Sequence, residues 1–180
     1  IVQNADPSKE VVALGQTYFA IQTRKQEITE QEYDSLSDDE KRFYQRKLTK
    51  QGNYTLQKVA SSAGVKNMAE FHNAGYMGLY NGETAKDIAT RKGISDKEDI
   101  LDYMSSTELA ANLFRITQTD EVLKNKNINN EDDACITHHN VGQAVRQTIK
   151  KIGGTMPEDL PTPSKSAKQI EKEKMKRLKR

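Results

Sequence analysis

The apolar positions of the chain recur mostly at intervals of three and four residues, which places them on one face of an α-helix. The clearest case is the stretch 104–123, MSSTELAANLFRITQTDEVL. Ser105 and Glu108 have the spacing of a capping box, in which each side chain satisfies a backbone N–H of the first turn. The stretch also has a broad apolar arc, made up of Leu109, Ala110, Leu113, Phe114 and Ile116. The pattern therefore predicts a helix that packs against a core through this arc.

Four polar residues of the same helix lie opposite the apolar arc, at positions i, i+4, i+7 and i+11: Glu108, Asn112, Arg115 and Thr119. Two interpretations are open. A row of this kind is commonly a solvated face, or an internal set in which Arg115 pairs with an acid of a neighbouring helix. It is alternatively a binding surface, because polar and charged groups set the register of a contact. We name the four as candidate partner-binding residues.

Helix signals also recur through the first third of the chain. The pair Asp6-Pro7 is followed by apolar positions at helical spacing as far as residue 28, which predicts a long first helix. Two capping-box patterns follow, Thr29 with Glu32 and Ser37 with Glu40. The second predicts a helix that runs to residue 63, with Gly52 as a candidate hinge because glycine destabilises a helix interior by about 1 kcal/mol.

Glycines divide the next part of the chain into short pieces. They stand at Gly64, Gly75, Gly78, Gly82 and Gly93. The spacing predicts short helices at 67–74 and 84–91 within an irregular hairpin region. A polar loop at 124–133 comes after the helix predicted within 104–123. Asp132 or Asp133 is a candidate cap for a last core helix that ends at Gly153-Gly154.

No segment alternates apolar and polar residues in the manner of a strand. We therefore predict an all-α fold, a bundle of long helices over residues 1–154. Three of the four prolines fall in 155–166, so residues 155–163 are predicted to form an extended spacer.

The end of the chain is strongly basic. Residues 164–180 carry eight Lys or Arg and two Glu, which leaves residues 1–163 of this +2 chain with a net charge of −4. Like charges in such density stay solvated until an anionic surface neutralises them, so we expect a tail that is disordered, or helical only on binding. Its cations are candidate electrostatic contacts to nucleic acid: Lys165, Lys168, Lys172, Lys174, Lys176, Arg177, Lys179 and Arg180.

Signals for catalysis or for a bound metal are weak. The spacing of Cys135, His138 and His139 suits zinc, but a structural zinc site needs four ligands and the chain has one cysteine, so we expect no metal. No phosphate-binding loop, dinucleotide fingerprint or nucleophile elbow is present, and we expect no cofactor and no enzymatic activity. A lone cysteine and the lack of an apolar run of some 20 residues favour a reducing, cytoplasmic compartment without membrane contact. The chain starts at Ile1 rather than Met, so we expect further sequence before it.

The segments 59–71 and 88–100 share a small residue, a glycine and an acid–hydrophobic pair, as in the first helix and turn of a helix-turn-helix. However, Glu70 and Asp99 occupy the position where a recognition helix has an apolar residue, and acids are repelled by phosphates. Scaffolding by helical hairpins is therefore the favoured interpretation.

Three segments in order resemble the DNA-damage-inducible protein D (DinD) family: GQTYFAIQTRKQE at 15–27, STELAANLFRITQT at 106–119 and VGQAVRQTIKKIGGTMPEDLPTP at 141–163. The resemblance extends from residue 1 to residue 163. It implies that this is the region that follows an N-terminal domain similar to BRO-N.

The same resemblance implies a function in the SOS response. Members of the family bind RecA filaments on single-stranded DNA, inhibit strand exchange and promote filament disassembly. The expected partner is thus the RecA filament, with non-specific nucleic acid contacted through the tail, and self-association is left open. The alternative is a DNA-binding transcriptional regulator or antirepressor-like protein that uses the two glycine hairpins.

Overall fold

The computed structural model describes residues 30–95 and 98–178, and within them every regular element is helical. The α-helices are α2 (Glu30–Asp34), α3 (Asp38–Ser62), α4 (Met68–Leu79), α5 (Ala85–Arg91), α6 (Ser106–Asn125), α7 (Glu131–Lys151) and α8 (Ala167–Leu178). Two 3₁₀ turns, η1 (Ile100–Tyr103) and η2 (Pro157–Asp159), lie between them. The predicted all-α fold is confirmed. The predicted helix before residue 28 and the matching segment 15–27 lie outside the described residues.

The helices begin where side chains can satisfy the free N–H groups of the first turn. Ser37 and Glu40 form the predicted capping box of α3, and Thr84 and Asp87 form another at α5. Helix α7 is capped by Asn130 rather than by an aspartate. The acids that follow it at 131–133 lie in the first turn, where the helix dipole favours negative charge.

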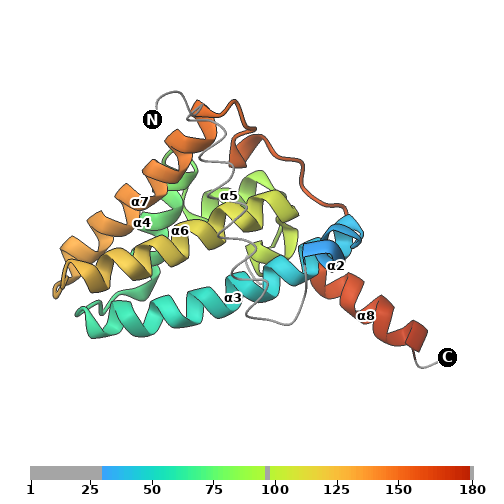
Figure 1. The fold of residues 1–180 in the computed structure, drawn as a ribbon, viewed down its shortest axis with the longest axis horizontal. Helices are drawn as coiled ribbons and strands as arrows, with labels where there is room; N and C mark the ends of the chain where they lie inside the picture. Colours follow the sequence, from blue (N-terminus) through green and yellow to red (C-terminus); the bar gives the residue numbers. More distant parts are fainter. Residues whose placement is uncertain (1–29, 96–97, 179–180) are drawn as a thin grey trace, which may run out of the picture.

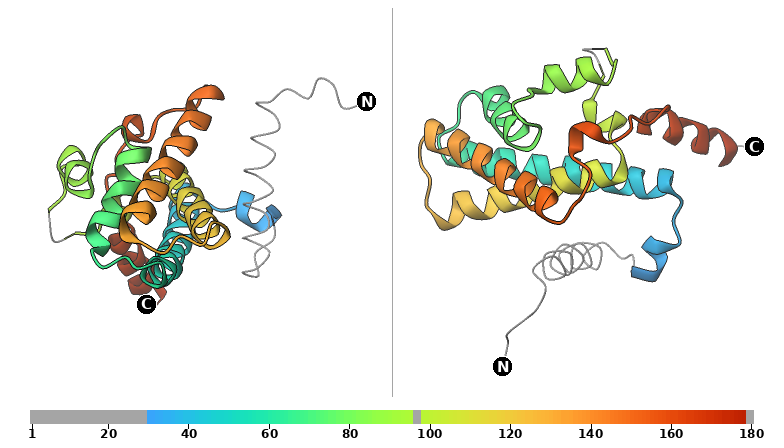
Figure 2. Two further views of the ribbon diagram at one scale, coloured as in Figure 1. Left: turned by 90° about the vertical axis from the view of Figure 1, so that its left-hand side faces the viewer. Right: turned by 90° about the horizontal axis from the view of Figure 1, so that it is seen from above.

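The two largest packing interfaces are pairs of helices that run in the same direction, α3 with α6 and α4 with α7. Figure 1 shows α3 and α6 side by side along the long axis, while α7 and α4 are inclined across one end and α8 projects beyond the other. The views in Figure 2 show the same pairs from the side and from above, with α5 outside α4. Helix α6 contacts α3, α4 and α7, so neighbours surround it on several sides.

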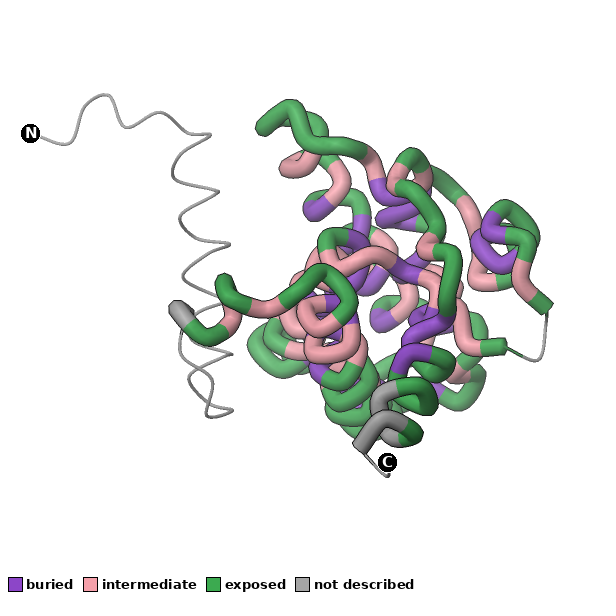
Figure 3. Tube along the Cα trace, turned by 90° about the vertical axis from the view of Figure 1, so that its right-hand side faces the viewer, coloured by how far each residue is buried: buried purple, intermediate pink, exposed green. Residues whose placement is uncertain are grey.

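Buried positions form two apolar clusters, one at each end of α6. Figure 3 colours the buried stretches of the chain purple. The first contains Tyr80, Ile88, Leu101, Met104 and Leu109. The second contains Leu56, Ala60, Phe71, Ile116 and Leu123. Because helices pack on several sides of α6, its apolar arc alone does not define the core.

Two glycines predicted as helix breakers are instead inside α4, which does not end at residue 74. A Cβ on Gly78 would overlap the carbonyl oxygen of His139, and a Cβ on Gly142 would lie 2.7 Å from the oxygen of Gly75. These glycines let the backbones of α4 and α7 touch. Gly52 is also no helix boundary, since α3 passes through it and a Cβ there would lie 3.2 Å from Leu113 on α6.

The expectation of a disordered tail is wrong for residues 164–173. Ser166 and Gln169 cap each other's backbone N–H groups at the start of α8, and Ser166, Ala167 and Ile170 are buried. The Arg42 guanidinium also donates to the carbonyl oxygen of Lys165 at 2.5 Å. Capping and burial of the first turn stabilise a helix that charge density alone argued against.

The spacer before α8 is likewise attached to the body rather than freely extended. Pro157 is buried, and Arg146 on α7 pairs with Glu158 at 2.6 Å. Arg91 on α5 donates to the Glu158 carbonyl oxygen at 3.1 Å. Within the described ranges, no helix combines the length and apolar character needed to cross a bilayer.

Candidate functional site

The polar row of α6 is an internal network, not a surface. Glu108, Asn112 and Thr119 have no exposed area, and Arg115 is 1% exposed. The prediction that these residues contact a partner is therefore wrong for this fold, because α3, α4 and α7 cover the helix. The internal interpretation was correct, although the partner of Arg115 is not an acid.

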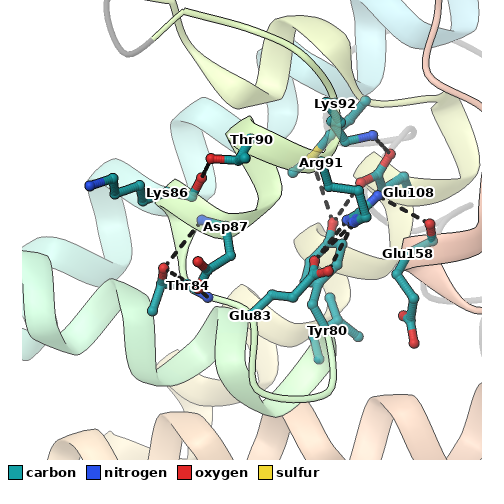
Figure 4. A network of polar contacts seen from close by, with 12 residues as sticks. Tyr80, Glu83, Thr84, Lys86, Asp87, Thr90, Arg91, Lys92, Glu108 and Glu158 are labelled. Carbon is teal, nitrogen blue, oxygen red and sulfur yellow. Dashed lines mark hydrogen bonds and ion pairs between the residues drawn. The ribbon is translucent and has the colours of Figure 1, made fainter.

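Glu108 joins α6 to α5 and α4 (Figure 4). Its carboxylate accepts from Lys92 Nζ at 2.8 Å and from the Tyr80 hydroxyl at 2.9 Å. Burial raises the pKa of Glu108, while the charge of Lys92 opposes that shift. Because the carboxylate is used in this way, Ser105 caps α6 through its own oxygen alone, and the predicted capping box is only half formed.

Arg115 lies at the other end of the network. Its guanidinium donates to Asn112 Oδ1 at 3.1 Å and bonds to His138 Nε2, while His138 Nδ1 lies 2.9 Å from the Phe71 carbonyl oxygen. Nδ1 therefore carries the proton, and Nε2 accepts from Arg115. Burial, followed by the charge of Arg115, lowers the pKa of His138 well below its usual value.

No carboxylate forms an ion pair with Arg115 within the described ranges. The positive charge of Arg115 contacts neutral groups instead. One of them is the ring of Tyr76, whose centroid lies 4.9 Å from the guanidinium carbon. A buried cation without a countercharge is costly, so the surrounding groups must hold their geometry closely. The network explains why these polar residues are in the core, and it offers no open position for a substrate.

Gly75 provides the space that this network needs. A Cβ at Gly75 would overlap both the Arg115 guanidinium and the His138 imidazole. The sequence contained a signal for this close approach, since Gly75 and Gly78 are spaced for one face of a helix, but the same glycines also fitted turns.

The residues considered for zinc do not converge. His138 points into the core with both ring nitrogens engaged, whereas Cys135 and His139 line an outer groove of about 710 Å³ between α4 and α7. No group of three or more His, Cys, Asp or Glu side chains is arranged to hold a metal ion in the part of the chain that the structure describes.

The candidate helix-turn-helix segments also differ from a groove-reading motif. In the first, α4 would be the recognition helix, but it packs along α7 and buries Phe71, Tyr76 and Leu79. In the second, α5 ends at Arg91 and is followed by the 3₁₀ turn η1. Gly64 and Gly93 nevertheless have the positive φ expected of residues that end a helix, 88° and 65°.

A second open site is a cleft between α3, α4 and α5, with a volume of about 790 Å³. Its walls are made by Lys50, Asn53, Tyr54 and Gln57 of α3, His72 and Tyr76 of α4, Ala85 and Lys86 of α5, and residues 98–101. This cleft was not predicted, because residues 50–57 on α3 and 72–86 come together only in the tertiary fold.

Polar contacts define the wall of the cleft. Gln57 Nε2 lies 3.0 Å from His72 Nε2, and Lys50 pairs with Asp99 at 2.8 Å. Burial, followed by the charge of Arg115, lowers the pKa of His72 to about 4, so the ring is neutral at pH 7. The cleft thus presents amide, imidazole and aromatic groups beside lysines.

The structure describes some of the tail residues that were predicted to contact nucleic acid. Lys165, Lys168, Lys172 and Lys176 are exposed, and Lys165 pairs with Glu173 at 2.9 Å. The side chains of Lys174 and Arg177, and residues Lys179 and Arg180, lie outside the described part. What is described is an all-helical domain with a charged core and cationic outer helices.

This domain has known relatives. A family model, the DinD C-terminal domain, matches residues 36–170, so the chain belongs to that family. The chain is 53% identical over 175 residues to a protein named DNA damage-inducible protein D from Escherichia coli (strain K12), which covers 95% of this chain. This chain, in turn, spans 64% of the length of that relative. No solved structure matches the chain.

Proposed function

We propose that this chain is part of a DNA-damage response protein that binds RecA filaments on single-stranded DNA, inhibits strand exchange and promotes filament disassembly. The observation that carries the proposal is the 53% identity to DNA damage-inducible protein D over 95% of the chain. The filament as partner comes from the family resemblance of the three sequence segments. We further propose that the protein acts in the cytoplasm, by binding rather than by catalysis.

The charge distribution supports a nucleoprotein partner. Acids gather in the first turns of α4 and α7, at Glu70, Glu131, Asp132 and Asp133, whereas exposed lysines line α3 and α8. A filament of protein on DNA offers both protein surface and phosphates, so a body with separated charges can contact both.

The experiment is co-sedimentation of the chain with RecA filaments assembled beforehand on single-stranded DNA, together with a strand-exchange assay. We expect the chain to sediment with filaments, to release RecA from them and to slow strand exchange. RecA without DNA is the control. Absence of co-sedimentation at low salt would refute the proposal.

The alternative, a transcriptional regulator, predicts base-specific duplex binding. Burial of α4 against α7 weighs against it, because the apolar side of that helix is not free to enter a groove. A duplex selected from random sequences at moderate salt would favour this alternative instead.

A further inference from the structure

The outer face of α3 carries cations and one tyrosine. Lys47, Lys50, Tyr54 and Lys58 are all exposed, and at 100° per residue they fall within an arc of about 80°. They extend along about 16 Å of helix, at 1.5 Å per residue. The acids of α3 are confined to its first turn, so residues 41–62 contain six Lys or Arg and no Asp or Glu.

Tyr54 is unusual because its ring is outside the core. Tyr54 is 61% exposed and belongs to neither of the two buried apolar clusters. Lys58 Nζ lies 4.3 Å from the ring centroid, one turn further along α3. An aromatic ring held between lysines on a helix surface is the arrangement on which an unstacked base can lie while cations take the phosphates.

The cleft between α3, α4 and α5 opens beside this face of α3. Tyr54 is at its edge, and the neighbouring Asn53 and Gln57 present amide groups to the same space. Asn53 Oδ1 is buried and has no hydrogen-bond partner among the described residues. Amides and a neutral His72 can bond to the polar edges of a base, which carry both donors and acceptors.

Two carboxylates, those of Glu98 and Asp99, also line the cleft. Asp99 pairs with Lys50, and Glu98 bonds to the Tyr103 hydroxyl. By contrast, Lys47, Lys58 and Lys86 have no ion pair within residues 30–95 and 98–178. The cations available to phosphates are therefore on the α3 and α5 side of the cleft.

We propose that this face of α3 binds single-stranded nucleic acid, with one base stacked on Tyr54 at the mouth of the cleft and the backbone along Lys47 and Lys58. The base must be unstacked to reach the ring, so duplex DNA cannot make the same contact. The inference goes beyond the function proposed above, because the chain makes this contact without RecA.

The test is anisotropy of a labelled oligothymidylate titrated with the intact chain over a range of salt concentrations. Tyr54→Ala should weaken binding about 5- to 150-fold, the usual effect of losing one stacked base, whereas Tyr54→Phe keeps the ring and should bind like the parent. Lys58→Gln should reduce the slope of log affinity against log salt by about 0.7, the value of one phosphate contact on a single strand. The matched control, Lys150→Gln on α7, should leave the slope unchanged.

A duplex of the same length separates stacking from general attraction by the basic α8. Duplex affinity should be the same for Tyr54→Ala and the parent. The inference is overturned if the parent does not bind the oligomer at low salt, if Tyr54→Ala binds it like the parent, or if the variant loses duplex and single strand equally. A chain that binds filaments but no free strand refutes this inference alone, and the converse refutes the RecA proposal alone.

Discussion

At the scale of single residues, the stability of the core depends on buried polar groups that must keep their hydrogen-bonding geometry. Arg115 bonds to Asn112 and His138, and its charge has no carboxylate partner in the described ranges. A cation in that setting is stable only while each neutral partner stays in place. Gly75 is part of the same arrangement, because its missing side chain leaves the room that the guanidinium occupies.

Gly75→Ala should therefore be strongly destabilising. The new methyl group would overlap Arg115 and His138, so we expect the free energy of unfolding to fall by about 1–3 kcal/mol, or more if α4 and α7 must separate. Urea denaturation followed by circular dichroism measures the change.

Gly52→Ala is the control for this prediction. A Cβ at Gly52 would meet the flexible ends of Leu113 and Ile116 at 3.2 Å, and alanine gains about 1 kcal/mol in helix propensity, so the net change should be small. Equal losses for the two variants would show that the contact at Gly75 is not special.

At the scale of elements, α8 is attached to the body by its first turn and projects from it afterwards. Arg42 on α3 donates to three carbonyl oxygens, those of Asp102, Met104 and Lys165, and thereby holds η1 and the start of α8 together. Ile170 is 7% exposed, whereas Lys172 and Lys176 are exposed. The element thus combines a docked end with a charged end.

Removal of residues 164–180 should lower the free energy of unfolding by about 2–3 kcal/mol, because Ile170 loses its burial and Arg42 loses one acceptor. A truncation that ends at residue 173 retains the docked turn and should melt like the intact chain. Thermal melting of both truncations measures this. Equal melting of the two would mean that the first turn of α8 adds no stability.

At the scale of the whole molecule, buried neutral histidines connect stability to pH. Folding lowers the pKa of His138 and brings that of His72 to about 4, below the value of about 6.5 for an unfolded histidine. As the pH falls below about 6.5, the unfolded chain takes up protons that the folded chain does not, so folding becomes less favourable. The stability contributed by these rings is complete above pH 6.5 and is lost towards pH 4.

The free energy of unfolding should therefore decrease as the pH is lowered from 7 to about 4.5. Urea titrations at several pH values measure the slope, and His72→Gln should make it shallower, because glutamine does not titrate and can still bond to Gln57. An unchanged slope in the variant would mean that folding does not lower the pKa of His72.

Much of this protein could be predicted from its sequence, because the signals are local. Helical periodicity, the caps at Ser37 and Thr84, and the lack of strand patterns predict the all-α class, and each depends on residues within a few positions of one another. Matching segments also indicated the family.

Tertiary structure decided everything that depends on which residues of other helices a side chain faces. Periodicity separates the two faces of α6 but does not reveal that helices cover both, so the row from Glu108 to Thr119 is inside. Likewise, no local rule distinguishes a glycine that ends a helix from Gly75, which lets a second helix approach, and none brings Tyr54 and His72 to one cleft.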